Sequence, residues 1–511
     1  MLSDNQPLVY PRSVNDMLKG TKKRRDVVVD NLWRAPIVIT NDSPHPGERP
    51  HFTMPGTEDL LRDLVWRRAQ VLYGTPLPCP LFQRLNTEWL AICQNGHASL
   101  YWLAHLLVQE SEQNGYHTEP YGSAGSSFVA FLAGITHINP LPPHYRCPQC
   151  RYTEFSEAAA CGYDLPEKLC PRCKTVLERD GQDLSAEIFM GLHGEIRPAF
   201  ELNFAVDYPP MHDPHFSLRF GCNNIDMLEN DAPNIYRFLE QYTGRGIAEV
   251  DFADPRVYAL FSSPAELGVS AEKIGYPTGT LGLPEWGQYE AEIAAAAAPH
   301  NFADLVSLSA GLHSFVDEER TVSLGFTASL DDLFTGLIQQ GVDQKNACGI
   351  VHEIIRKPCN RDFSRLAKCG LSQERITALE NICALPSKAQ IVTYCRMAFR
   401  LAWFKLYYPA EYYAAYLNGR QAFLSAVLFQ NGSEGFKAYY EQTYQSEKPS
   451  GINGIYLCIA YEAICRGIRF LPVDLNCSAP KTFTLVNGAI RLPLASLRGM
   501  NPEQVKAAIQ G

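Results

Sequence analysis

The sequence predicts an α+β protein that is mostly helical, with short strands and one cysteine-rich module. Amphipathic patterns typical of helices run over Thr57–Tyr73 and over Asn86–Ser111, and residues 224–420 are mostly helical with short Gly and Pro breaks. The stretch RPAFELNFAVDY, Arg197–Tyr208, alternates apolar and polar residues with the two-residue period of a strand. Residues 139–175 are rich in Pro and Cys and have too few large apolar side chains to fold by burial alone.

The composition is that of a globular protein. At 511 residues the length suggests about three domains, and 46% hydrophobic with 20% charged residues is ordinary for a soluble chain. No run of about eighteen apolar residues occurs, so we expect no membrane partner. The N-terminus has no charged segment followed by an apolar one, which argues against a signal peptide and for the cytoplasm. The 16 cysteines are therefore expected to be reduced thiols or metal ligands.

Four cysteines in two knuckles form the strongest local motif. The text RCPQC holds Cys147 and Cys150, and LCPRC holds Cys170 and Cys173. Two CxxC pairs bring four thiolates into a tetrahedron suited to zinc, in a closed site that stabilises the fold rather than catalysing. Cys161 lies between the knuckles and is not needed as a ligand. The alternative is a set of buried or redox-active cysteines without a metal.

A loop rich in glycine and serine precedes a short apolar stretch. Its text is YGSAGSSF, and its candidate phosphate-binding residues are Gly122, Ser123, Gly125, Ser126 and Ser127. Backbone N–H groups of such a turn can bind a nucleotide phosphate when they lie at a helix N-terminus. The same text also fits a plain helix cap without a ligand, and both interpretations stay open.

The chain is acidic overall but has one basic stretch. The net charge of −10 and the pI of about 5.8 give no global attraction to nucleic acid. Residues 345–405, however, hold eleven Lys or Arg against four acids, an excess of seven positive charges. We take Arg356, Lys357, Arg361 and Arg365 as candidate contacts to a DNA phosphate backbone. A solvated helix face opposite acidic neighbours explains the same count equally well.

One face of the predicted strand carries a single acid. Phe200, Leu202 and Phe204 share one face, and Ala199 and Glu201 lie side by side on the other. Two acids at the latter positions could hold a pair of metal ions. Because alanine supplies no ligand, only Glu201 remains.

Taken in order, these motifs resemble one enzyme family. The matching text includes YGTPLP (73–78), GSAGSSFVA (122–130), GITHINPLPPHYRCPQC (134–150), GYDLPEKLCPRC (162–173), PAFELNF (198–204), FSSPAELGV (261–269), GTLGLPEWG (279–287) and AFRLAWFKLYYPAEYYAAY (398–416). From about residue 10 to its end, the chain resembles the polymerase region of the bacterial DNA polymerase III alpha subunit of the PolC type. The resemblance implies a palm of the polymerase-beta-like nucleotidyltransferase type, a zinc-ribbon-like module and mostly helical fingers.

The resemblance also suggests how the chain is divided. We expect an N-terminal arm and connector (1–56), a palm part with the phosphate-type loop (57–145), the zinc module (146–175), residual palm (176–245), helical fingers (246–425) and a C-terminal region ending in a partial helix-hairpin-helix (426–511). That last region holds the glycine turn LRGMNP, Leu497–Pro502, which can present amides to a DNA phosphate. The family's nuclease and N-terminal domains have no counterpart, so we expect a truncated polymerase region.

Several positions depart from the family at its reaction centre. The family's strand reads Pro-Asp-Ile-Asp-Leu-Asn-Phe, and its two aspartates, which hold the metal ions of phosphoryl transfer, correspond to Ala199 and Glu201. Soon after this strand, a long family segment with the thumb and the third aspartate is missing, and Asp213 is the candidate remnant of that acid. Tyr121 replaces an arginine, and Gln390 replaces a histidine. We therefore expect a degenerate paralogue, a pseudoenzyme with structural zinc that needs magnesium only if it is active.

Three functions fit the sequence. The first is an inactive scaffold that still binds DNA, weakly and without sequence specificity, or binds replication proteins. The second is an active DNA polymerase that uses rearranged acids such as Glu201, Asp207 and Asp213. The third is a protein-interaction module without DNA contact, for which the acidic pI is mild support.

Overall fold

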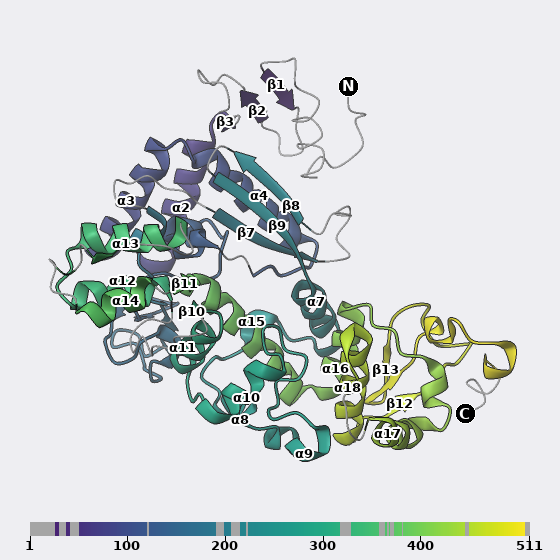
Figure 1. The fold of residues 1–511 in the computed structure, drawn as a ribbon. Helices are drawn as coiled ribbons and strands as arrows, with labels where there is room; N and C mark the ends of the chain where they lie inside the picture. The colour runs from purple at the N-terminus through teal and green to yellow at the C-terminus, as the bar shows by residue number, and fades with distance from the viewer. Residues whose placement is uncertain are drawn as a thin grey trace.

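The computed structural model shows an α+β protein that is mostly helical and has small sheets (Figure 1). It describes residues 26–29, 37–40, 51–119, 122–190, 199–205, 215–220, 223–316, 329–356, 363–364, 367, 372–380, 382–444 and 449–505. None of the described helices combines the length and the apolar character that a bilayer crossing requires.

Three long helices form the first large unit. They are α2 (Thr57–Tyr73), α3 (Cys79–Gln94) and α4 (Ala98–Gln113), followed by η1 (Ser123–Ser126) and α5 (Phe128–Leu132). Each buries one stripe of side chains, such as Leu61, Val65 and Ala69 of α2. The single helical stretch expected over 86–111 is two helices, because the chain turns between them at Gly96, where φ is 68°.

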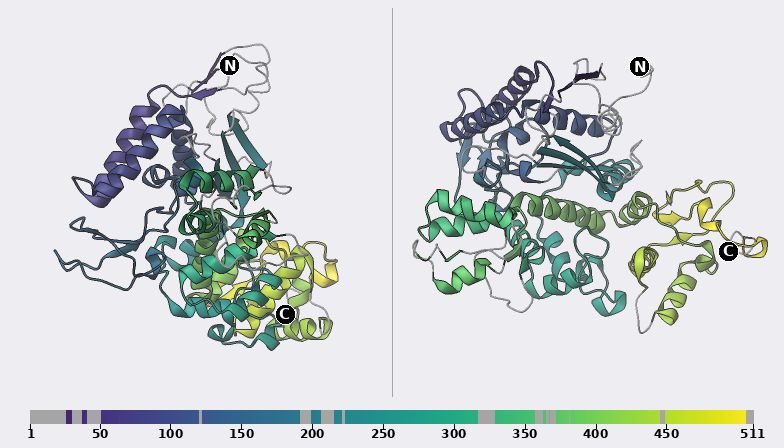
Figure 2. Two further views of the ribbon diagram at one scale, coloured as in Figure 1. Left: turned by 60° about the vertical axis from the view of Figure 1, so that its left-hand side comes forward. Right: turned by 45° about the horizontal axis from the view of Figure 1, so that its top comes forward.

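Two small antiparallel sheets lie in the N-terminal half. One has the order β1-β2-β3 and consists of β1 (Asp26–Val29), β2 (Ile37–Thr40) and β3 (His51–Thr53). The other places β4 (His144–Arg146) between β5 (Thr153–Phe155) and β6 (Glu178–Asp180), with η2 (Gly162–Asp164) in the connection and α6 (Glu187–Met190) beyond it. This second sheet carries the cysteine knuckles and projects from the body of the molecule in the left view of Figure 2.

A mixed sheet lies next to the first helices. It consists of β7 (Ala199–Ala205), β8 (His215–Phe220) and β9 (Asn223–Asn230) in the order β7-β9-β8. β7 runs parallel to β9, and β8 runs antiparallel to β9. The chain passes directly from β9 into α7 (Asp231–Thr243), because the Asn230 side chain caps that helix by accepting from the N–H of Ala232 at 2.8 Å.

The largest apolar core joins the helices that follow. They are α7, α8 (Pro255–Ser262), α9 (Ala271–Ile274), α10 (Gln288–Ala297), α11 (Phe302–Leu312), α15 (Lys388–Tyr407), α16 (Pro409–Gly419) and α18 (Gly451–Cys465). α15 is buried on nearly every side, as its apolar sequence requires. α16 packs closely on α7 at Gly419, where a Cβ atom would lie only 2.5 Å from Ile235 Cγ1.

Two smaller parts complete the fold, the first around an apolar cluster of its own and the second packed into the largest core through Phe436, Phe470 and Ile490. One holds α12 (Leu330–Gln339), α13 (Gln344–Arg356) and α14 (Gln373–Glu380), beside the paired strands β10 (Phe315–Val316) and β11 (Ile382–Ala384). The other lies at the C-terminal end of the molecule in Figures 1 and 2, and contains α17 (Gly432–Thr443) and a sheet of β12 (Phe470–Leu471), β14 (Ala489–Arg491) and β13 (Thr484–Val486).

A buried ion pair joins α15 to α18. Lys405 Nζ lies 2.7 Å from Glu462 Oε1, and both side chains are fully buried. The Lys405 ammonium also donates to the carbonyl oxygens of Gly279 and Leu281, at 2.9 and 2.8 Å, and Glu462 accepts from the Tyr413 hydroxyl. Burial lowers the pKa of Lys405 to about 8, and the Glu462 carboxylate opposes part of that shift. The loop before α10 is therefore fixed to two helices by one ammonium group.

We expect the change Glu462→Gln to lower the free energy of unfolding by roughly 3–5 kcal/mol, because the Lys405 ammonium would stay buried without its counter-charge. The double change Lys405→Met with Glu462→Gln should cost less than either single change, since no unpaired charge remains. Urea unfolding at pH 7 measures these differences.

The control is Glu441→Gln, which removes the partner of Lys273 from a pair whose two side chains are 42% and 45% exposed. That loss should be about 1 kcal/mol or less. If Glu462→Gln were no more destabilising than this control, the buried pair would not have the role assigned to it.

Candidate functional site

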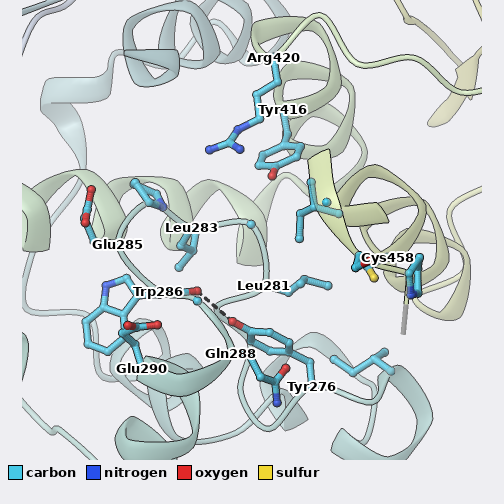
Figure 3. A pocket seen from close by; sticks show the side chains of 18 of the residues that line it. Tyr276, Leu281, Leu283, Glu285, Trp286, Gln288, Glu290, Tyr416, Arg420 and Cys458 are labelled. Atoms are coloured by element: carbon cyan, nitrogen blue, oxygen red, sulfur yellow. Dashed lines mark hydrogen bonds between the residues drawn. The ribbon is translucent and has the colours of Figure 1, made fainter. Parts of the chain in front are cut away.

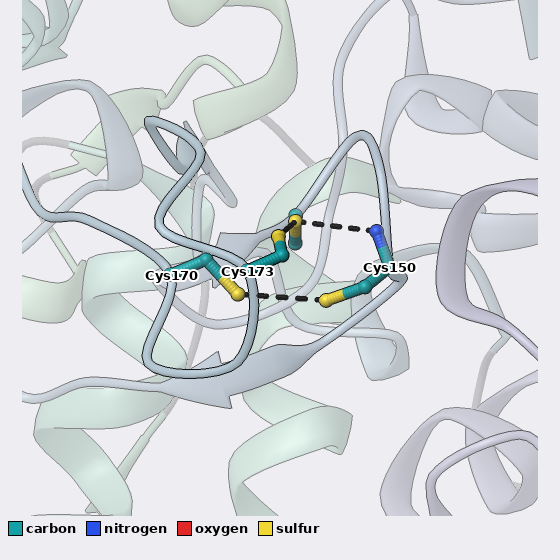
Figure 4. Close-up of side chains that lie close together, drawn as sticks. Cys150, Cys170 and Cys173 are labelled. Carbon is teal, nitrogen blue, oxygen red and sulfur yellow. Dashed lines mark hydrogen bonds between the residues drawn. The ribbon is translucent and has the colours of Figure 1, made fainter.

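The four knuckle cysteines lie together, and Figure 4 shows Cys150, Cys170 and Cys173 on two neighbouring loops. The Sγ atoms of Cys147, Cys150, Cys170 and Cys173 all lie within 4.8 Å of one another. Two of the pairs, Cys147–Cys173 and Cys150–Cys170, have Sγ atoms 3.4 Å apart, and none of the four forms a disulfide. Thiolates around zinc, at bond lengths of about 2.3 Å, lie about 3.8 Å from one another, so the observed spacing fits a tetrahedral ion.

The two knuckles have the same backbone geometry. In each, the N–H of the first cysteine donates at 2.8 Å to the carbonyl oxygen five residues later. The residue directly after the second cysteine is left-handed in both, with φ of 63° at Arg151 and 64° at Lys174. The small core beneath them centres on Tyr145, Leu165 and Leu177, so a bound metal would supply much of the stability of this part.

Asp164 ties the cysteine module to the helical part of the chain. Its carboxylate accepts from the N–H groups of Phe302 and Ala303, at 2.7 and 2.9 Å, in the first turn of α11. The Cys161 thiol lies 3.2 Å from the same carboxylate and is not part of the four-cysteine group.

The Gly/Ser loop is bonded by a carboxylate of the protein itself. Ser127 is the N-cap of α5, and its hydroxyl oxygen accepts from the N–H of Ala130 at 3.1 Å. Glu88 of α3 is fully buried and accepts from the Ser127 hydroxyl at 3.0 Å and from the N–H of Val129 at 3.1 Å. These bonds are those of a capped helix. They occupy the N–H of Val129, which a phosphate bound at this helix N-terminus would need.

Neighbouring contacts hold this loop in place. Arg84 pairs with Glu88 and donates from Nη2 to the carbonyl oxygen of Ser126 at 2.8 Å. Gly125 lies against α15, where an added Cβ would meet Ala389 Cβ at 2.8 Å. Phosphate binding by the loop, which also includes Gly122, stays a prediction.

The strand register places a second acid beside Glu201. Because β7 and β9 run parallel, Glu201 pairs with Asp226 and Ala199 pairs with Asn224. Asp226 is also the partner of Ser217 in β8. Residues paired across adjacent strands belong to the same face of a sheet. The fold thus brings two acids into register where the sequence indicated one.

The sequence analysis did not single out Asp226, although this acid lies in a short segment directly before a helix cap. The text NNIDMLEN, Asn223–Asn230, forms a strand that ends at the cap of α7. The acid becomes relevant only when β9 is known to neighbour β7, and a single sequence does not show which strands pair.

Part of the basic stretch serves the interior of the protein. Arg396 and Arg400 of α15 are 3% and 8% exposed, and both pair with the buried carboxylate of Glu119. Burial lowers the pKa of Arg400 to about 10, so the guanidinium stays charged at neutral pH. Together with Lys405, three of the eleven basic residues of 345–405 are therefore unavailable to DNA.

Other candidates cannot be placed in the described part of the structure. Arg356 ends α13, but its side chain, like those of Ser123, Ala199, Glu201 and Asp226, lies outside that part. Whole residues outside it are Tyr121, Asp207, Asp213, Lys357, Arg361 and Arg365.

Comparison with known proteins agrees with the resemblance. Residues 59–225 match the family model of the bacterial DNA polymerase III alpha NTPase domain. PolC-type DNA polymerases III match 99% of this chain in Caldanaerobacter subterraneus subsp. tengcongensis (29% identity), Clostridium perfringens (28%) and Thermotoga maritima (28%). These matches cover 45%, 44% and 46% of the relatives, so the chain spans a little under half of their length.

The same comparison shows that residues are missing within the matched region. The match to the Caldanaerobacter protein extends over 631 positions, at least 120 more than the 511 residues of this chain. That relative therefore carries segments that this chain lacks. Over 99% of its length the chain is therefore similar, at 28–29% identity, to bacterial DNA polymerases III of the PolC type, and residues 59–225 match the alpha-subunit family model.

Proposed function

We propose that the protein is a catalytically inactive, cytoplasmic scaffold derived from a PolC-type polymerase. The observation that carries this proposal is Ala199, which stands in β7 where the family has the first of its two strand aspartates. In this proposal the β7–β9 sheet is a palm remnant, and the helices from α8 to α16 correspond to the fingers.

The absence of an aspartate at position 199 removes a metal ligand that phosphoryl transfer requires. Two-metal phosphoryl transfer needs carboxylates that bridge ions about 4 Å apart, so that the attacking and leaving oxygens are both stabilised. Ala199 cannot bridge two ions, and Glu201 is a methylene longer than aspartate. The missing segments support the same conclusion, because we place the thumb among them.

A second candidate function is residual nucleotidyl transfer. It is favoured by the register of Glu201 with Asp226, which gives the sheet two acids on adjacent strands. Such a pair could hold one Mg²⁺, since carboxylate oxygens suit this ion. One ion would stabilise the transferred phosphoryl group only in part.

We expect no extension of a primed DNA template with Mg²⁺ and all four deoxynucleoside triphosphates. The measurement is primer extension on denaturing gels with the whole chain. Extension that is abolished by Glu201→Gln or by Asp226→Asn would contradict the proposal and support the second candidate. Ser217→Ala, at the partner position of Asp226 in β8, is the control that leaves both acids in place.

We further propose that DNA is contacted weakly and without sequence preference by the segment around Arg356, Lys357, Arg361 and Arg365. Affinity should be no tighter than roughly micromolar at physiological salt, with a log–log salt slope of about −0.9 per phosphate contact. Changing all four residues to Gln should remove most of the binding and flatten the slope in a fluorescence anisotropy titration.

The matched control for that variant is a change of Arg62, Arg67, Arg68 and Arg245 to Gln. These are four exposed cations outside the segment. An equal loss in the control would show that only overall charge matters. No binding at low salt would favour a protein-interaction module without DNA contact.

We propose zinc as the metal of the four-cysteine group, in a structural role. One zinc per chain should be found by elemental analysis, and Cys147→Ser or Cys170→Ser should lower that content and the melting temperature. Cys161→Ser should keep the metal, because this thiol is bonded to Asp164 instead. Well under one zinc per chain, with all four thiols open to alkylation, would refute the assignment.

A further inference from the structure

A large cavity lies between the loop that precedes α10 and the helices α16 and α18, and part of its wall comes from the GTLGLPEWG text, residues 279–287 (Figure 3). Its volume is about 990 Å³. Its walls are mainly apolar and aromatic, and include Tyr276, Leu281, Leu283, Trp286 and Ile455. A cavity of this size and character can take a large apolar side chain together with the backbone that carries it.

One polar group in the cavity lacks a partner among the described residues. The Tyr416 side chain is fully buried, its hydroxyl has no hydrogen bond there, and Figure 3 shows the hydroxyl facing into the cavity. Burial raises the pKa of this phenol, so it stays a neutral donor and acceptor. Because a buried hydroxyl without a partner is costly, an occupant that bonds it would be favoured.

The charged groups of the lining are mostly acidic. Glu285 and Glu290 line the cavity, and Arg420 lies 5.0 Å above the Tyr416 ring. A second cavity of about 460 Å³ shares part of this lining and adds Asp231. Asp231 lies 3.1 Å from Arg420, so the one arginine already has a carboxylate partner.

The charges of the lining favour a basic ligand in the cavity over one that carries phosphates. The Glu285 carboxylate lies 3.3 Å from Nε2 of His313 and raises the pKa of that imidazole. Glu290 adds a second carboxylate to the lining. A nucleotide or a DNA backbone would bring phosphates toward these acids, which is unfavourable. A peptide with basic residues would be attracted to them.

We propose that this cavity binds an extended peptide segment of a protein partner. A Trp, Phe or Leu of the peptide fills the space beside Trp286 and Tyr276, a backbone carbonyl accepts from the Tyr416 hydroxyl, and a neighbouring Lys or Arg faces Glu285 and Glu290. Buried aromatic anchors commonly carry most of the binding energy at such sites. The inference rests on the scaffold function proposed above and names the class of partner.

The experiment uses the whole chain and a bead library of N-acetylated octapeptides, randomised at every position. We expect enrichment of peptides with a large apolar residue and at least one Lys or Arg within two positions of it. The best peptide, fluorescein-labelled, should bind roughly three- to ten-fold more weakly to the variant Glu285→Gln with Glu290→Gln. Tyr416→Phe, which removes only the hydroxyl, should also weaken binding.

The control is Glu157→Gln, an exposed acid outside the cavity, which should bind like the unchanged chain. Absence of enrichment, enrichment of acidic peptides, or equal affinity in the Glu285/Glu290 variant would overturn the proposal, as would dTTP that binds the cavity and displaces the peptide. Primer extension on the same preparation distinguishes a failure of the inactive-scaffold proposal from a failure of the peptide-site proposal. Extension with peptide binding would refute the inactive scaffold alone, and no extension without peptide binding would refute the peptide site alone.

Discussion

The contact between Lys405 and Glu462 is the constraint on which the helical half depends. The ammonium bonds a carboxylate of α18 and two carbonyl oxygens of the loop before α10. Arg466 adds a bond from its guanidinium to the carbonyl oxygen of Lys405 at 2.9 Å. Three segments that are distant in sequence, α15, the end of α18 and the loop before α10, therefore meet at one charge with no access to water. Such a charge tolerates few alternative arrangements, because any movement that breaks its bonds leaves it unsolvated.

The local elements could be predicted because their causes are local. The helix expected over 57–73 is α2, and the strand expected around residue 201 is β7. The periodicity of apolar residues and the capping residues of a helix lie within a few positions of one another, so a single sequence is enough to predict these elements.

The features that sequence could not provide all involve partners far along the chain. Arg396 and Arg400 look like surface cations until the fold brings Glu119 beside them. The Gly/Ser loop looks open to a phosphate until Glu88 of α3 is seen to bond it. Asp226 becomes a candidate metal ligand only once β9 is known to pair with β7, which places it opposite Glu201. Charge counts and loop motifs therefore describe what a segment could do, whereas tertiary contacts decide which of its groups remain available.

The bonds of Asp164 have a consequence for how this architecture can be rearranged. This residue lies between the two knuckles but caps α11, and Gly162 beside it lies so close to β6 that a Cβ would sit 2.0 Å from the Asp180 carbonyl oxygen. The cysteine module is thus not an independent cassette that recombination could exchange or delete. A graft that brought only the knuckles to another protein would lose the helix that Asp164 serves, and a deletion would leave two amides of α11 without their carboxylate. The module and the helical core must be inherited together.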